Sequence, residues 1–588
     1  MTGMNYFNYI RNNITEILNN LKKTGCLPVS VDIANFSVEP ARDRNHGDIA
    51  TNVALALSKS ANLKPRDLAQ EIVACLKIND EIESVEIAGP GFINIILKDI
   101  FWQARLVEVL KNGNEYGSIK KDLNKLINIE YVSANPTGPM HVGHGRGAVV
   151  GDVLANLLGK AGYRVTKEYY INDAGTQIDI LTKSLFFRYQ EALGLDVGNM
   201  PEEYYPGDYL AELARNLAEK DGDKWVQIIK EEGYASLKQV SIEAMMELIR
   251  SDLFSLGIVH DVFVSERGIV NNNEVTEALE TLKQKGLVYQ GVLEPPKGRR
   301  PDDWESRPQT LFKATQFGDD VDRPVKKSDG SWTYFATDMA YHQDKFKRGF
   351  KAMINIWGAD HSGYVKRMKS AVVALTDGLG QLDVKLCQMV NLMDNGKPLK
   401  MSKRSGTFVT LRDVIDEVGK DVVRFMMLTR KNDAQLDFDL VKVKEQSRDN
   451  PVFYVQYSHA RCCSVLRNAL DIFNKSEIDD NDLIKADISL LTDSSEINLI
   501  KIIASWPQVV LGAAESHEPH RIAYYLYELS SAFHSLWSKG SKERVSLRFL
   551  VPKNRTLTLA RLAMVRSLAI TIASGLEVMG VEPLEEME

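Results

Sequence analysis

Two short segments, far apart in a chain of 588 residues, constrain its fold most strongly. The first, residues 135–144, reads Asn-Pro-Thr-Gly-Pro-Met-His-Val-Gly-His and follows an apolar run at 127–132 that suits a buried parallel strand. Helical spacing of apolar residues over 148–158 and a strand-like run at 165–171 come next. This order of strand, turn, helix and strand predicts a β-α-β unit within a Rossmann-like, doubly wound α/β domain.

The histidines of this segment suit a phosphate site. His141 and His144 are three residues apart at the predicted helix start, so their side chains should project to the same side. Gly143 and Gly145 leave room for a ligand to approach the backbone, and free N–H groups at a helix start favour an anion. Two histidines near a turn can also be surface or capping residues, or half of a metal site. The strand before them, the helix after them and the second segment favour phosphate binding.

The second segment, residues 400–406, reads Lys-Met-Ser-Lys-Arg-Ser-Gly. Lysine carries a compact charge on a long stem, which suits binding of a pyrophosphate that moves as it leaves. Lys400 and Lys403 can therefore stabilise charge that develops only in the transition state. A lysine pair alone is more often a solvated loop, but the whole string together with the upstream histidines predicts a two-part ATP site. We assign Met401 and Gly138 to ATP contacts as well.

A third group of polar residues follows the strand-like run at 352–357. Residues 358–361 read Gly-Ala-Asp-His, at the sheet edge where doubly wound folds bind nucleotides. We assign Gly358 and His361 to ATP, although the tetrapeptide alone is weak evidence.

Composition and cysteine spacing exclude several classes of protein. A net charge of −7 argues against indiscriminate nucleic-acid binding, so an RNA contact would use local basic patches. We find no apolar run near the ~18 residues of a transmembrane helix, and no signal-peptide pattern at the N-terminus. The five cysteines show no metal-binding spacing. We therefore expect a cytoplasmic protein without a membrane span or a bound metal.

Both segments resemble those of the class I aminoacyl-tRNA synthetases, and the residues around them resemble arginyl-tRNA synthetases of bacterial type. The resemblance covers nearly the whole chain, including residues 170–175, Tyr-Ile-Asn-Asp-Ala-Gly, and 449–461, which begin Asp-Asn-Pro-Val-Phe-Tyr. It implies that His141, His144, Lys400 and Lys403 are catalytic. It also implies that arginine is activated with ATP to arginyl-adenylate and then transferred to the 3′ terminal adenosine of tRNA(Arg).

An arginine site needs acidic groups that accept a planar guanidinium. The resemblance implies that Glu130, Tyr334 and Asp338 face the guanidinium, and that Ser133, Asn135 and Asp360 lie around the α-amino and carboxylate end. Each acid alone could equally be a surface or helix-end residue. The match is weaker at Asp360, where members of the family differ.

The resemblance also implies a domain order. We expect a tRNA-elbow-binding domain over 1–110, a catalytic domain over 120–390 with a helical insertion at about 172–300, a lysine-loop and stem-contact region over 391–448, and an all-α anticodon-binding domain over 449–588. In the first domain, Phe92 would stack on a D-loop nucleotide and Asn94 would bond to it. Phe92 could instead be a core aromatic residue.

The expected partners are L-arginine, ATP with Mg²⁺ as the substrate complex, and tRNA(Arg), with no tightly bound cofactor and no membrane, and we expect a monomer. Two alternatives stay open. One is another class I synthetase, of which a lysine enzyme is the nearest chemical neighbour. The other is a catalytically silent, tRNA-binding paralogue, against which the intact histidines and lysines argue.

Overall fold

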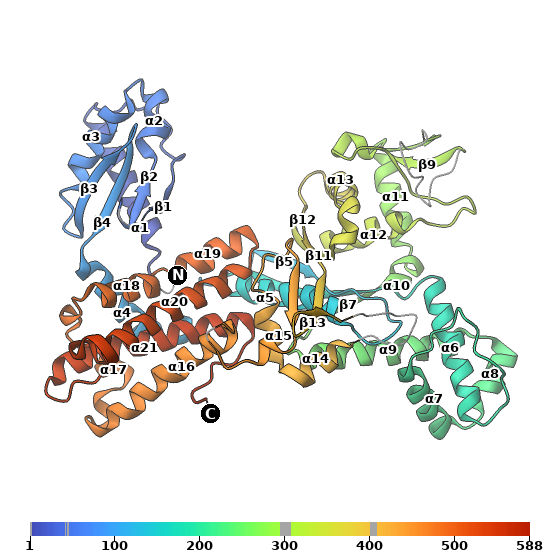
Figure 1. Ribbon diagram of the computed structural model, residues 1–588. Helices are drawn as coiled ribbons and strands as arrows, with labels where there is room; N and C mark the ends of the chain where they lie inside the picture. Colours follow the sequence, from blue (N-terminus) through green and yellow to red (C-terminus); the bar gives the residue numbers. More distant parts are fainter. Residues whose placement is uncertain are drawn as a thin grey trace.

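The computed structural model describes residues 3–41, 43, 46–293, 307–399, 409–447 and 449–587. Lys400, Met401 and Lys403 lie outside these described residues. The molecule is elongated: an N-terminal lobe stands on one end of a long row of helices, and the main sheet lies near the centre (Figure 1). Two further lobes lie at the opposite end from the N-terminal lobe.

The central sheet has five parallel strands in the order β12-β11-β5-β6-β7. In chain order they are β5 (Leu126–Glu130), β6 (Arg164–Ile171), β7 (Val262–Ser265), β11 (Ala352–Gly358) and β12 (Gln381–Cys387). The strand order reverses between β5 and β11, which confirms the doubly wound topology. The carboxyl ends of these two strands therefore form the switch point where ligands bind in such folds.

Two helices follow strands of this sheet, α5 (Val142–Lys160) after β5 and α13 (Val365–Thr376) after β11, and α12 (Tyr334–Lys347) leads into β11. Ile127, Ile129 and Ile354 are almost completely buried, as expected for parallel strands covered on both faces. The predicted β-α-β unit is thus confirmed, with α5 beginning six residues earlier than its apolar periodicity indicated (Val142 rather than Ala148).

The segment predicted as one helical insertion returns once to the central sheet. Its first part is a lobe of α6 (Thr176–Ala192), α7 (Asp208–Asp221), α8 (Lys224–Glu232) and α9 (Ala235–Ser255). β7 then pairs with β6 in parallel, before α10 (Glu266–Asn271) and α11 (Glu274–Gln284). The prediction of a helical insertion missed β7 because a four-residue strand gives little periodic signal. A small antiparallel sheet follows, formed by β8 (Val288–Gly291), β9 (Gln309–Phe312) and β10 (Arg323–Pro324).

The N-terminal lobe is an antiparallel sheet in the order β1-β2-β4-β3 with three helices. Its elements are α1 (Tyr6–Lys23), β1 (Val38–Pro40), β2 (Ile49–Thr51), α2 (Val53–Ala61), α3 (Pro65–Leu76), β3 (Ile82–Ala88) and β4 (Phe92–Leu97). The next helix, α4 (Asp99–Asn112), packs instead against the C-terminal helices α18 and α21. The chain therefore leaves this lobe near residue 98, ahead of the predicted boundary at about residue 110.

The C-terminal part begins with a small sheet, β14-β13-β15, and continues as helices. The strands are β13 (Val390–Asp394), β14 (Lys397–Pro398) and β15 (Leu436–Asp439), and two helices, α14 (Leu411–Val418) and α15 (Lys420–Met426), lie between β14 and β15 in the chain. The remaining helices are α16 (Pro451–Asn468), α17 (Asp480–Leu483), α18 (Ser494–Ala504), α19 (Trp506–Ser516), α20 (His520–Ser538) and α21 (Arg555–Met579).

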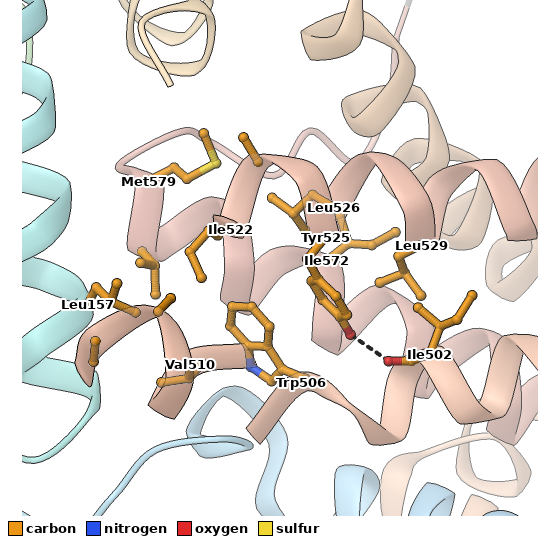
Figure 2. Close-up of a cluster of buried hydrophobic side chains, with 14 of the residues drawn as sticks. Leu157, Ile502, Trp506, Val510, Ile522, Tyr525, Leu526, Leu529, Ile572 and Met579 are labelled. Carbon is orange, nitrogen blue, oxygen red and sulfur yellow. Dashed lines mark hydrogen bonds between the residues drawn. The ribbon is translucent and has the colours of Figure 1, made fainter. Parts of the chain in front are cut away.

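The core of this helical part reaches back to the catalytic sheet. Trp506 stacks on Tyr525 with ring centroids 5.1 Å apart, and the Tyr525 hydroxyl donates to the carbonyl of Ile502 at 2.9 Å (Figure 2). Leu157, on α5, lies in the same cluster. The helix that follows the first strand of the sheet is thus also part of the C-terminal core.

Two helical stretches, Ser494–Ser516 and Arg555–Met579, are long and apolar enough to cross a membrane by length and composition. The sequence scan did not find them. In α21, 83% of the stretch is buried against other parts of the chain. Packing within the helical domain accounts for its apolar composition.

Candidate active site

The histidine motif forms the start of α5. The ring of His141, the N-cap, accepts a hydrogen bond from the N–H of Gly143 at 3.1 Å, and the ring of His144 accepts one from the N–H of His141 at 3.3 Å. The two rings stack with centroids 3.8 Å apart, which confirms that they project to the same side. Both are partly exposed beside the carboxyl end of β5, where the helix start favours an anion.

The glycines of this motif serve contacts within the protein. A Cβ on Gly143 would come within 2.9 Å of the His141 ring, and one on Gly145 within 2.8 Å of Leu411. The first glycine lets the histidine fold back as a cap, and the second lets α14 approach α5. The expectation that they leave room for a ligand is therefore wrong for Gly145, while an ATP contact at Gly143 stays a prediction.

The chain just after the lysine motif pairs with the histidine motif. Thr410 forms an isolated antiparallel bridge with His141, and the N–H of Leu411 donates to the carbonyl of Met140 at 2.8 Å. The Thr410 hydroxyl then caps α14 by accepting from the N–H of Asp413 at 3.0 Å. Residues 410 and 411, which are remote from the histidine motif in sequence, are thus bonded to it through the backbone.

A buried arginine that the sequence analysis did not identify supports the same junction. Arg146, on α5, donates to the carbonyls of Gln388 at 3.1 Å, Lys431 at 2.8 Å and Ala434 at 2.6 Å. Its acceptors lie just before β13 and β15, which pair in the small sheet and which precede and follow the lysine motif in the chain. One arginine within a helical pattern gives no sequence signal, so only the structure reveals this contact.

The acidic side of the site lies on α12. The Thr333 hydroxyl caps this helix, so Tyr334 and Asp338 lie one turn apart at its start. The Tyr334 side chain is largely exposed, whereas Asp338 is partly buried and accepts a 2.7 Å hydrogen bond from the Tyr364 hydroxyl. Burial, together with the nearby Glu130 and Glu266 charges, raises the pKa of Asp338 to about 7 despite this bond.

A second carboxylate, absent from the sequence prediction, lies near Asp338. Glu266 directly follows β7, and its helix α10 packs against α12. Burial and the neighbouring Asp173 raise the pKa of Glu266 to about 7. Across the described residues, no lysine or arginine forms an ion pair with Asp338 or Glu266. The site therefore favours a bound cation, and the short polar-flanked run at 262–265 is the signal that could have revealed Glu266.

Tyr170 lies among these acids at the end of β6. Its hydroxyl is buried and has no hydrogen-bond partner within the described chain. Burial and the charges of Asp338, Glu266 and Glu130 raise its pKa, so it stays a neutral donor. An unpaired buried hydroxyl beside acids is poised to bond to a ligand.

The structure pairs Glu130 with a lysine. Its carboxylate accepts from the Nζ of the fully buried Lys345 at 2.7 Å and from the hydroxyl of Ser133 at 3.1 Å. Lysine already neutralises the charge of Glu130, whereas Asp338 has no such partner among the described ion pairs. Its predicted contact with arginine stays untested.

The backbone after β5 is strained. Val132 and Ser133 have φ values of 71° and 41°, which costs on the order of 1–3 kcal/mol per residue and is rare for a β-branched side chain. Two hydrogen bonds hold this turn: the N–H of Tyr170 donates to the Ser133 hydroxyl at 3.1 Å, and the Asn172 amide donates to the Ser133 carbonyl at 3.0 Å. The turn that would carry the amino-acid end of the substrate is thus rigidly fixed.

Asn135 and Gly138 lie in the loop between β5 and α5, against the helical lobe. The Asn135 amide donates to Gln177 at 2.8 Å, and the Tyr209 hydroxyl donates to the carbonyl of Thr137 at 2.7 Å. A Cβ on Gly138 would come within 2.9 Å of the Tyr209 hydroxyl, so this glycine also has a packing role.

Asp360 and His361 follow β11 on the other side of the switch point. Both side chains are exposed, and the His361 Nε2 lies 3.4 Å from the Asp360 carboxylate. A Cβ on Gly358 would overlap that carboxylate. The structure therefore brings these residues to the predicted sheet edge, while their contacts with substrates stay predictions.

The N-terminal lobe has a separate cavity of about 310 Å³ that includes both residues predicted there. Phe92 is 43% exposed, so the alternative of a core aromatic residue is wrong. Asn94 lies on the same strand and lines the same cavity, with Asn52 and His46. An exposed ring next to amides suits a nucleotide base.

A doubly wound sheet, with stacked histidines at the first helix and with Thr410 and Leu411 bonded to the chain beside them, has the architecture of a class I aminoacyl-tRNA synthetase. Family models match the chain in three parts. The arginyl-tRNA synthetase N-terminal domain matches residues 8–97, the class I (R) tRNA synthetase catalytic domain matches 105–463, and the DALR anticodon binding domain matches 455–587.

Curated relatives are similar along the whole chain. The arginine--tRNA ligase of Parvibaculum lavamentivorans is 55% identical over 99% of this chain and 100% of its own length, and that of Rhodospirillum rubrum is 53% identical over 99% and 100%. A Campylobacter jejuni structure described as an arginyl-tRNA synthetase has a TM-score of 0.72 at 33% identity, over 84% of this chain and 100% of that chain. The Thermus thermophilus arginyl-tRNA synthetase shares the fold, with a TM-score of 0.73 at 21% identity over 98% and 100%. The chain belongs to the arginyl-tRNA synthetases, class I enzymes that activate arginine with ATP and transfer it to tRNA.

Proposed function

We propose that this chain forms arginyl-adenylate at the carboxyl edge of its central sheet and passes the arginyl group to tRNA(Arg). The observation that carries the proposal is the backbone bridge between Thr410 and His141, which ties the chain after the lysine motif to the histidine pair. The carboxylate of arginine attacks the α-phosphorus of ATP, a new C–O–P linkage forms, and the bond to pyrophosphate breaks. The 3′ terminal adenosine of tRNA then takes the arginyl group, and AMP leaves.

His141 and His144 are proposed to bind the phosphates of ATP, and Lys400 and Lys403 to neutralise the leaving pyrophosphate. The helix start beneath the two rings adds partial positive charge at the same place. These groups are already in position to stabilise the charge that develops at the phosphates in the transition state. Such preorganised contacts accelerate a reaction. Mg²⁺ enters as part of the MgATP substrate.

Asp338 and Glu266 are proposed to bind the guanidinium of arginine. A guanidinium stays charged at neutral pH and presents a planar fork of donors, which two carboxylates can accept. Tyr334 would cover the fork from the solvent side, and the Tyr170 hydroxyl is a further donor at the pocket wall. Ser133, Asn135 and Asp360 are proposed to lie around the α-amino and carboxylate groups.

The contacts with tRNA outside the catalytic site are proposed from the cavity in the N-terminal lobe and from the family of the helical domain. Phe92 and Asn94 line a cavity that suits a D-loop base, and the helical domain would bind the anticodon. We propose a cytoplasmic monomer, as the sequence analysis expects.

The test is aminoacylation of total tRNA with each of the labelled amino acids in turn. Arginine should be the amino acid that is transferred, and pyrophosphate exchange should follow arginine and not lysine. A lysine signal would reassign the enzyme to the neighbouring class I specificity. A protein that binds tRNA but turns over no ATP with any amino acid would be a silent paralogue, and would overturn the proposal.

A further inference from the structure

Arg424, on α15, is buried where the catalytic part of the chain meets the end of the last helix. Its guanidinium donates to the carbonyl of Met579 at 2.7 Å, to the carbonyl of Leu256 at 3.0 Å and to the carboxylate of Asp152 at 2.5 Å. These acceptors belong to the end of α21, to the C-cap of α9 and to α5. One side chain thus joins three elements that lie far apart in sequence.

Asp152 is the charged partner at this junction, and it lies in the middle of α5. Burial alone would raise its pKa, but Arg424 and Lys167, whose Nζ lies 2.7 Å away, together hold it below its usual value. One turn later on α5, the Asn156 amide donates to the carbonyl of Val578 at 3.2 Å. Two successive turns of α5 are therefore joined to the last turn of α21, one through Arg424 and one directly.

The opposite end of α5 is the start that holds His141 and His144. The helix is continuous over 19 residues, and further along, Leu157 packs into the C-terminal core (Figure 2). A continuous helix of this kind moves as a unit, so a shift imposed at Asp152 is transmitted to the histidine pair. The contact with α21 is therefore linked to the histidine pair through α5.

The end of α21 is shaped to admit this arginine. Gly580 has a φ of +66°, and a Cβ there would overlap the Arg424 guanidinium. The glycine ends the helix with two hydrogen bonds, from the N–H of Gly580 to the carbonyl of Glu577 and from the N–H of Val581 to the carbonyl of Leu576, each 2.9 Å long. Backbone conformation and space therefore both require glycine at this position.

We propose that Arg424 is a positioning residue that couples the last helix of the anticodon-binding domain to the nucleotide site. Binding of tRNA to the helical domain and binding of ATP at the sheet edge then change each other's affinity. The inference rests on the proposed function, because it takes tRNA and ATP as the two ligands. The change in affinity is reciprocal, so it can be measured from either side.

The test compares two glycine variants that are matched in backbone geometry. Gly580→Ala pushes the Arg424 guanidinium aside. Gly286→Ala is the control, since Gly286 ends α11 with the same pair of hydrogen bonds and a φ of +69°, and its Cβ would have no neighbour within 4 Å. Arg424→Lys is a second test variant, which keeps a positive charge but cannot bond to three acceptors in one plane.

The measurement is the affinity of the full-length protein for a non-hydrolysable ATP analogue, with and without saturating tRNA. For the wild type and Gly286→Ala we expect tRNA to change this affinity by at least about fivefold. For Gly580→Ala and Arg424→Lys, the ratio of the affinities measured with and without tRNA should fall toward one. The affinity measured without tRNA should stay within about twofold of that of the wild type. A merely structural role would lower the melting temperature and leave the ratio unchanged.

A wild-type ratio of one overturns the coupling, and so does a wild-type ratio retained in either test variant. The readout is binding and not turnover, so this failure is separate from failure of the proposed function. A protein that couples the two ligands but does not charge tRNA with arginine would reject the function and keep the coupling.

Discussion

The Tyr364 hydroxyl donates a 2.7 Å hydrogen bond to the carboxylate of Asp338 and fixes its orientation in the candidate arginine pocket. Tyr364 lies in the 3-10 segment Ala359–Tyr364 after β11, whereas Asp338 lies at the start of α12. The bond favours the ionised carboxylate, but burial and the nearby acids outweigh it. The Asp338 carboxylate is therefore about half ionised near pH 7, and a bound cation would complete its ionisation.

Arginine affinity should depend on pH around neutrality. The pKa values of Asp338 and Glu266 are both raised to about 7, so each group is protonated below that pH and loses the charge that attracts a guanidinium. The guanidinium itself stays charged throughout this range. We expect arginine binding, measured by calorimetry without ATP, to weaken by up to about tenfold per carboxylate for each pH unit below 7. A dissociation constant that is flat from pH 5.5 to 8 would contradict this assignment.

Asp338→Asn tests the amino-acid specificity directly. The change keeps the shape and removes the charge, so the guanidinium loses a charge-assisted partner worth roughly 2–5 kcal/mol. The Michaelis constant for arginine should rise steeply, while that for ATP moves little. Citrulline, which has the shape of arginine without its charge, should gain relative to arginine. Tyr364→Phe is the companion variant, and we expect it to have a smaller effect in the same direction. Equal shifts for arginine and ATP would make Asp338 a structural residue.

Two histidine variants separate helix capping from phosphate binding. His144→Ala should lower the rate of adenylate formation by about 10²–10³-fold, the usual cost of losing one preorganised contact. His141→Asn keeps a good N-cap acceptor and removes the imidazole, so the helix start should stay intact while the rate falls by a similar factor. Pyrophosphate exchange gives the rates, and arginine binding serves as the control. A normal rate of pyrophosphate exchange in both variants would show that the two histidines do not bind the phosphates.

Lys403→Ala should give the same loss of adenylation rate, with arginine affinity unchanged. The substitution removes one of the two lysines proposed to neutralise pyrophosphate. Single-turnover measurement of adenylate formation at saturating ATP separates this loss from weaker ATP binding. An unchanged single-turnover rate would show that the lysine motif does not act on the leaving group.

Two truncations test where the N-terminal lobe ends. Removal of residues 1–97 should leave a catalytic core that melts cooperatively and binds tRNA more weakly. Removal of residues 1–110 should destabilise the remainder, because α4 would be lost from the C-terminal core. Phe101, Trp102, Leu106 and Val109 are almost fully buried, at about 1.5–3 kcal/mol each, and their sum is comparable with a whole domain's stability of about 5–15 kcal/mol. Equal melting temperatures for the two truncations would show that α4 belongs to the N-terminal lobe and does not stabilise the C-terminal core.

The sequence by itself determined the local framework of the site. The strand-like run at 127–132, the helix after His141 and the strand-like run at 165–171 all reflect hydrogen bonding and side-chain periodicity over a few residues. Such patterns are readable because the backbone allows only a few regular structures. The doubly wound fold and the sheet edge that carries the site follow from them.

Only the tertiary structure decided which distant groups meet there. Glu266 lies near Asp338 because the four-residue strand β7 joins the sheet edge, and Glu130 is neutralised by Lys345, which lies more than two hundred residues further along the chain. Gly145 admits α14, and Arg424 joins α5 to α21. Each of these depends on how buried charges and close-packed surfaces are satisfied across the whole molecule, because an unpaired charge or an overlap in the interior is costly. No local pattern in the sequence encodes that long-range balance.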